Sequence, residues 1–238
     1  MTKRIDELVQ SILDGADHPL APSLRSWCHE SRLFLNFAET YATKIRKKAR
    51  LAPLAAELAD LFAELAVAAF LVRDRRCAVR YEPYQATGRR GPDFQVVFKG
   101  HSSLHVEVTR LRLLEDDDLP RAAFKLARVV CDKIGQCPPS AVNLLAVVLP
   151  PGAESDILVP SAIRLLDREP QREEGLASSE LRLEGVRAYH RQRQRLSAIA
   201  LCSFGSDGRP LWVKLWLNPQ AKHPLPPDVT KYLISIAR

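Results

Sequence analysis

The sequence predicts an α/β fold, with a mixed central sheet flanked by helices and an N-terminal helical cap. Three patterns predict it: an Ala- and Leu-rich helical segment, short runs that alternate apolar and polar residues, and one continuous apolar run typical of a buried central strand. The chain has 238 residues and is 46% hydrophobic, which is enough for a substantial core. We expect a cap over 1–50 and an α/β domain over 51–238, with a helical insertion at 151–195.

Residues 5–50 place apolar side chains at helical spacing, with breaks near Gly15 and Pro19. The last of these helices carries five cations within seven residues. A cluster of this kind suits either a solvated helix end or a patch that contacts phosphates. The five are Lys44, Arg46, Lys47, Lys48 and Arg50.

The elements beyond residue 50 follow from periodicity and from helix and turn signals. Pro53 suits the first turn of a long buried helix, and Asp118 with Pro120 signals the start of another. The run from Gly205 to Gly208 is typical of the turn of a β-hairpin. In chain order we expect a helix over 53–72, strands over 77–81, 94–98 and 104–111, a helix over 118–136, a strand over 142–149, two helical stretches within 151–195, and strands over 196–203 and 211–217.

Two carboxylates stand out in the predicted sheet. Asp93 starts one strand, and Glu107 lies inside the next among apolar neighbours. A buried carboxylate is costly unless it is paired or bound to a cation, so two on adjacent antiparallel strands suit one divalent ion. Glu64, just before an apolar half-helix, is a third candidate. Oxygen-only ligands favour Mg²⁺ or Mn²⁺, which polarise a phosphodiester and generate hydroxide from water.

This arrangement resembles the PD-(D/E)XK nuclease superfamily, which has the restriction-endonuclease-like fold. The family core is a helix, a three-strand meander, a second helix and a further strand, and it corresponds here to residues 53–149. The resemblance places the metal-binding acids on Asp93 and Glu107, with Glu64 as the helix acid. It implies a Mg²⁺- or Mn²⁺-dependent endonuclease that hydrolyses phosphodiester bonds in DNA.

The sequence departs from the family pattern at one position. The lysine that the family has two residues after the second acid is Thr109 here. A hydroxyl can orient a water but supplies no positive charge to the phosphate. Lys125 and Lys99 are the cations that we expect to replace it, and Arg128 and Lys133 are further candidates.

Each acid also has a structural interpretation. Asp93 can cap a turn, Glu107 can form an ion pair with Arg80 or Arg128, and Glu64 can be a helix charge that reaches solvent. The corresponding function is a catalytically impaired nuclease-fold protein that binds nucleic acid or a protein partner in defence or repair.

The charge distribution favours a polyanionic partner held from both flanks. The net charge is +7, divided as +3 over residues 1–50, +1 over 51–150 and +3 over 151–238. The second dense basic segment places Arg187, Arg191 and Arg195 on one helical stripe. We expect DNA to be bound by exposed cations of the two segments: Lys44, Arg46, Lys47, Lys48, Arg187, Arg191 and Arg195.

The cysteines and the N-terminus predict a cytoplasmic protein. The five cysteines are scattered without a CxxC pair, so we interpret them as reduced core residues. The N-terminus lacks the pattern of a secretory signal, and no apolar run is long enough to span a membrane. For protein partners, the sequence leaves two alternatives, a homodimer or a different protein.

Overall fold

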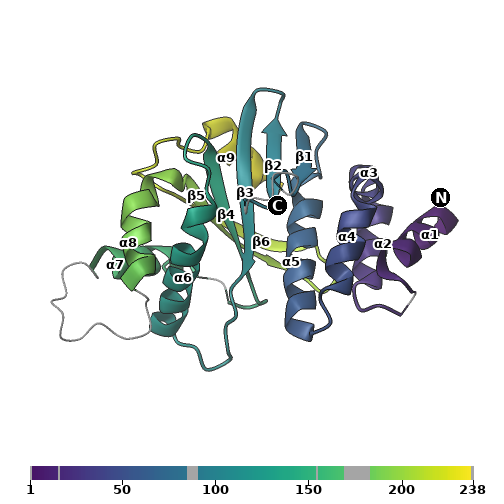
Figure 1. Cartoon of the computed structure of the whole chain (residues 1–238), viewed down its shortest axis with the longest axis horizontal. Coiled ribbons are helices and arrows are strands. Elements are labelled where there is room, and N and C mark those ends of the chain that lie inside the picture. Colours follow the sequence, from purple (N-terminus) through teal and green to yellow (C-terminus); the bar gives the residue numbers. More distant parts are fainter. Residues whose placement is uncertain (1, 16, 85–90, 154, 169–182, 237–238) are drawn as a thin grey trace.

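The computed structural model describes residues 2–15, 17–84, 91–153, 155–168 and 183–236. As the sequence predicts, N-terminal helices precede a six-stranded mixed sheet with interspersed helices (Figure 1). The loops predicted around 87–88 and 169–170 lie outside the described residues, as does the start of the second helical stretch of 151–195.

The sheet has the strand order β1-β2-β3-β4-β5-β6. The β3–β4 and β4–β5 pairs are parallel and the other pairs are antiparallel, which confirms the prediction of a mixed sheet. The strands are β1 (Cys77–Tyr81), β2 (Phe94–Phe98), β3 (Ser102–Arg110), β4 (Val142–Leu149), β5 (Ala198–Phe204) and β6 (Pro210–Leu217).

Helices cover both faces of this sheet. The first four, α1 (Thr2–Leu13), α2 (Ala21–Glu30), α3 (Arg32–Thr40) and α4 (Ala42–Arg50), precede the long helix α5 (Ala55–Leu71). The later helices are α6 (Leu119–Lys133), α7 (Leu158–Arg168), α8 (Leu183–Gln192) and α9 (Pro227–Ser235), with short 3₁₀ turns at 134–136 and 193–195. None of the described helices is long and apolar enough to cross a membrane.

Strand alternation divides the core into two layers. Val106 of β3 and Ala146 of β4 face one core, built with α1–α5 and α9. Leu145 and Val147 of β4 face a second core, built with α6, α7 and α8. The segment predicted as a helical insertion therefore covers one face of the sheet, on the left in Figure 1.

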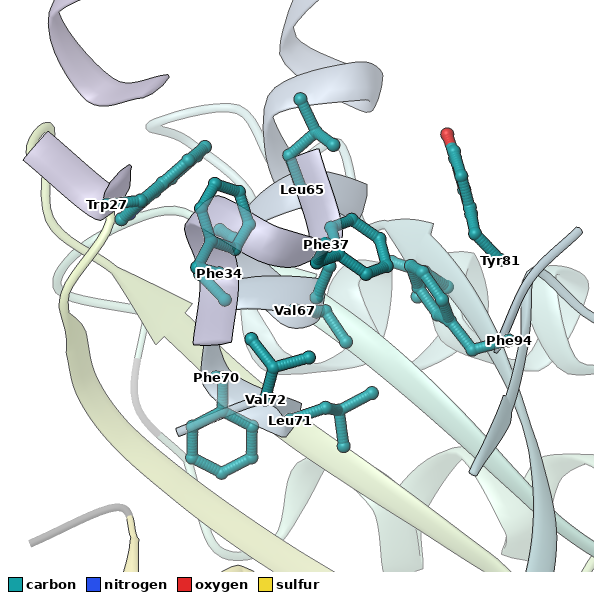
Figure 2. Close-up of a cluster of buried hydrophobic side chains, with 14 of the residues drawn as sticks. Trp27, Phe34, Phe37, Leu65, Val67, Phe70, Leu71, Val72, Tyr81 and Phe94 are labelled. Carbon is teal, nitrogen blue, oxygen red and sulfur yellow. The ribbon is translucent and has the colours of Figure 1, made fainter. Parts of the chain in front are cut away.

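The N-terminal helices share the first core. The ring of Phe37 lies 5.8 Å from that of Tyr81 and 6.4 Å from that of Phe94, and Trp27 lies 5.6 Å from Phe62 of α5. Figure 2 shows Trp27, Phe37, Tyr81 and Phe94 in this cluster of buried side chains. Aromatic burial of this extent fixes α3 and α4 against the sheet. Helix α4 buries Ile45 and Ala49, and its Lys44 points toward Tyr81 at the end of β1.

Several element boundaries differ from the prediction. The long helix begins at Ala55 rather than Pro53, because Leu54 is extended and its backbone N–H donates to the Glu57 carboxylate at 3.4 Å. The strand expected from 196 begins at Ala198, because a 3₁₀ turn occupies 193–195. Helix α9 has no counterpart among the elements expected from the sequence. The interpretation of the cysteines is confirmed, since all five are free thiols and four are buried.

Candidate active site

The difference in length between β2 and β3 positions Asp93. Their ladder ends at the pair Phe94–Val106, while β3 continues to Arg110. The backbone N–H of Val108 therefore has no partner on β2, and Asp93 accepts it through Oδ2 at 2.8 Å. Asp93 does cap a backbone group, as one interpretation held, but this group belongs to the neighbouring strand. The same register puts Asp93 beside Glu107.

Glu107 lies on the face of β3 that points toward α6. The residue is only 4% exposed, and its Oε1 lies 2.6 Å from Nζ of Lys133 on α6. The expected pairing with Arg80 or Arg128 is wrong, because the last turn of α6 brings Lys133 to the carboxylate. The other oxygen, Oε2, is buried and has no hydrogen-bond partner among the described residues. A buried carboxylate oxygen without a partner is energetically unfavourable.

Glu64 approaches from the opposite side, on α5. Its side chain is 12% exposed, and Oε1 lies 2.5 Å from Nζ of Lys48 on α4. Lys48 also lies 3.1 Å from Oε1 of Glu82. The interpretation of Glu64 as a helix charge that reaches solvent is therefore wrong. The expectation that Lys48 is freely exposed is also wrong, because the packing of α4 places it against the acidic residues.

The three carboxylates interact electrostatically. Burial, followed by the charge of Asp93, raises the pKa of Glu64 to about 7 against the opposing effect of Lys48. Burial raises the pKa of Asp93 to about 6, with Glu107 as the next cause. Burial also raises the pKa of Glu107, while Lys133 acts against this shift. The acids that the sequence singled out on three separate elements are thus brought close enough to influence one another.

A cleft of about 610 Å³ opens beside these acids, between α5 and α6. Glu64, Asp93 and Thr109 line it, and its remaining polar lining is largely cationic. Two further acids, Asp60 and Asp132, also line the cleft. The cationic residues are Arg110, Arg112, Lys125, Arg128 and Lys133.

These cations differ in how far their charge is already paired. Arg110 and Arg112 both bind Asp60, at 2.9 and 2.7 Å. Lys125 forms an ion pair with Asp117, so this expected site residue lines the cleft with its charge already neutralised. Arg128 is exposed and forms neither a hydrogen bond nor an ion pair with any described residue. It is thus the cation in this lining that is best placed to bind a phosphate.

The structure does not bring Lys99 to the cleft. Lys99 follows β2 at the end opposite to Asp93, six residues away along an extended chain. At about 3.3 Å per residue the separation is roughly 20 Å. Its Nζ lies over the ring of Phe98, 5.1 Å from the centroid. Lys133 is the cation that lies against the carboxylates on the α6 side.

The two basic segments do not line the cleft, apart from the contact of Lys48 with Glu64. Lys44 donates to the carbonyl oxygen of Tyr81 at 3.0 Å, and Arg46 donates to the carbonyl oxygen of Ser11 at 2.5 Å. Lys47 is exposed. Arg187 and Arg191 of α8 are exposed. The single helical stripe predicted for Arg187, Arg191 and Arg195 is wrong, because α8 ends at Gln192 and Arg195 lies in the following 3₁₀ turn, where it donates to Gln192 at 3.3 Å. Binding of DNA by these residues stays a prediction.

Two lysines contact the acids, Lys133 and Lys48, and the sequence indicates only Lys133 as a candidate for the missing motif lysine. Lys133 follows Lys125 and Val129 at four-residue steps along α6, and all three residues line the cleft. That spacing is a usable signal. Lys48 was assigned to a surface patch, and no local pattern reveals its contact with Glu64, which depends on how α4 packs against α5.

The donor set suits a hard divalent cation only in part. Among the described residues, no three His, Cys, Asp or Glu side chains form a ready-made metal site. The Asp93 and Glu107 pair, with the unpartnered Oε2 of Glu107, fits the way proteins usually bind Mg²⁺, through one or two carboxylates completed by water and substrate phosphate. Comparisons of the chain with known protein families, curated proteins and solved structures find no match.

Proposed function

We propose that the protein is a metal-dependent nuclease of the PD-(D/E)XK type that hydrolyses phosphodiester bonds in DNA. The observation that carries the proposal is the set of three buried carboxylates from α5, β2 and β3, which raise one another's pKa beside an open cleft with cationic walls. The element order α5-β1-β2-β3-α6-β4 supports a restriction-endonuclease-like core. Perturbed acids in a cleft are typical of catalytic sites.

In this proposal Asp93 and Glu107 hold Mg²⁺ or Mn²⁺, and Glu64 is a further ligand. The ion supplies Lewis-acid polarisation of the phosphodiester and a lowered pKa for bound water. The buried Oε2 of Glu107 would gain the partner that it lacks. Because carboxylates repel phosphate, the substrate must be bound by the cations of the cleft.

Lys133 takes the part of the missing motif lysine. Its ammonium group lies 2.6 Å from the Glu107 carboxylate, on the cleft side of α6, where positive charge would stabilise a developing charge on the phosphate. Thr109 lines the same cleft, and its hydroxyl can orient a water. Arg128, exposed and unpaired within the described residues, binds a non-reacting phosphate of the strand.

The direct test incubates purified protein with plasmid DNA and with single-stranded DNA, in Mg²⁺, Mn²⁺ or EDTA. We expect cleavage that requires the ion and is lost in Asp93→Asn and in Glu107→Gln. Matched controls are Asp17→Asn and Glu7→Gln, which make the same chemical changes at exposed positions. Cleavage that survives EDTA, or that survives both site substitutions, would refute the proposal.

Metal binding can be measured without any turnover. A ligand that binds only the folded state raises its stability, so Mn²⁺ should raise the melting temperature of the wild-type protein. Asp93→Asn should lose most of this shift, whereas Asp17→Asn should keep it. An equal shift in both variants would place the ion elsewhere on the protein.

A second candidate function rests on the two lysines. Lys48 and Lys133 each form an ion pair with one of the acids, so the cluster is partly neutralised without a metal ion. This arrangement favours a catalytically impaired nuclease-fold protein that binds nucleic acid or a protein partner in defence or repair. DNA binding without cleavage, together with no Mn²⁺-dependent rise in melting temperature, would support it over the enzyme.

A further inference from the structure

The two edges of the sheet differ sharply. The β1 edge is five residues long and exposes Ala78 and Arg80. The β6 edge is eight residues long, and Lys214 is its one charged residue. No hydrogen bond joins the backbone of 211–213 or 215–217 to a described segment other than β5. A long apolar edge strand is a template for pairing with another strand.

The sequence of β6 is nearly the same when read in either direction from Lys214. Residues 211–217 are Leu-Trp-Val-Lys-Leu-Trp-Leu. In an antiparallel pair of two identical strands with Lys214 on the two-fold axis, each residue faces its counterpart across the axis. Leu211 would then lie opposite Leu217 of a second copy, and Trp212 opposite Trp216.

The exposed side chains of β6 fit this pairing. Leu211 is 53% exposed and Leu217 is 49% exposed, and they lie at the two ends of the run. Alternation puts both leucines on the face of the α5 core, with Trp212 and Trp216 on the other face against the α6 core. Cross-strand pairs of aromatic and aliphatic side chains stabilise antiparallel sheets. The pairing would cover the apolar side chains of both faces.

The central lysine does not prevent this association. A lysine on an edge strand usually discourages pairing, and two lysines directly opposite each other repel. Here Nζ of Lys214 lies 2.5 Å from Oδ1 of Asp156, so each copy brings a carboxylate to the axis. Proline, which also blocks ladders, occurs only at Pro210, outside the run of seven residues.

We propose that two copies of this chain associate through β6, as antiparallel strands with Lys214 at the two-fold axis. The two six-stranded sheets then form one continuous sheet. The proposal uses neither the carboxylate cluster nor the cleft. Its test is therefore independent of the test of nuclease activity.

The test measures mass in solution by light scattering and by sedimentation across the micromolar range. Wild-type protein should be a dimer. Leu211→Lys with Leu217→Lys should be a monomer, because the register places lysines opposite each other. The control is Leu51→Lys with Leu114→Lys, which changes two leucines that are 68% and 66% exposed away from β6 and should stay dimeric.

Charge complementation tests the register itself. Leu211→Lys with Leu217→Glu places Lys opposite Glu at both ends of the pair, so this variant should regain the dimer. A mixture of the double-lysine and double-glutamate variants should likewise form a heterodimer. Monomeric wild-type protein, or a double-lysine variant that stays dimeric, would overturn the proposal. Failure of both complementation experiments would overturn this pairing of β6 with β6.

Discussion

Replacement of Glu64 by Gln should change how the stability of the protein depends on pH. Burial and the charge of Asp93 raise the pKa of Glu64 from 4.5 to about 7 in the folded protein. The folded state therefore holds this proton more tightly than the unfolded state, and protonation favours folding. The sign follows directly: the contribution of Glu64 to the free energy of unfolding is fully present below pH 4.5, falls as the pH rises and is lost above about pH 7.

The magnitude follows from the size of the shift. A change from 4.5 to about 7 corresponds to roughly 3 kcal/mol, at about 1.4 kcal/mol per pKa unit. Glutamine has nearly the same shape and does not titrate. The stability of Glu64→Gln relative to wild type should therefore rise by up to about 3 kcal/mol between pH 5 and pH 8. The difference between the two pH values cancels any constant cost of losing the Lys48 contact.

The assay is urea unfolding at several pH values between 5 and 8, in EDTA so that no divalent ion contributes. Carboxylates with lowered pKa, such as Asp74, titrate below this window. Asp93, whose pKa is raised to about 6, titrates within the window in both proteins, so the measured quantity is the difference between the variant and wild type at each pH. Glu7→Gln is the matched control, because Glu7 is exposed and forms no ion pair with a described residue. A stability difference between Glu64→Gln and wild type that is independent of pH would refute the buried, coupled state of Glu64.

Three further predictions concern the chemistry of the cleft. Lys133→Met should lower turnover by at least about 10²-fold, whereas Lys99→Met should leave it unchanged; equal rates in both would remove Lys133 from the proposed role. Thr109→Lys should increase cleavage if the natural site lacks sufficient positive charge, and single-turnover rates will show whether it does. Arg128→Gln should reduce the slope of log K against log salt by about 0.9 for duplex DNA, and Arg191→Gln measured in parallel reports whether α8 also contacts phosphate.

The strands of the sheet could be predicted from the sequence because the alternation of apolar and polar residues is a local pattern. Alternation located β1 and β2 at the bounds that the structure has, and it placed Asp93 and Glu107 on neighbouring strands. Simple counting would also have excluded Lys99, which lies six extended residues from Asp93. Helix α9 was missed because its approach is rich in proline and resembles a loop, although Pro227 and Asp228 suit the first turn of a helix.

The contact of Lys48 with Glu64 could not be found in the same way. Lys48 reaches Glu64 because Ile45 and Ala49, the buried residues of α4, pack into the core that also contains α5. A contact between helices that are far from the sheet motif in sequence depends on the packing of the whole core. From the sequence alone, a cluster of charged residues on a helix is interpreted as a solvent-exposed face, because the packing of the helix is not known.

In the proposed function, the charge balance of the cluster favours the binding of a further cation. The cluster includes Glu82, which contacts Lys48 at 3.1 Å and Lys44 at 4.0 Å. When the four carboxylates are ionised, the three lysines Lys44, Lys48 and Lys133 leave one negative charge unbalanced. Asp93 lies between the two ion pairs and has a backbone N–H as its partner, so the uncompensated charge is centred there. A divalent ion would reverse the sign of the cluster and turn a surface that repels phosphate into one that attracts it. Binding of the ion and binding of DNA should therefore be mutually dependent.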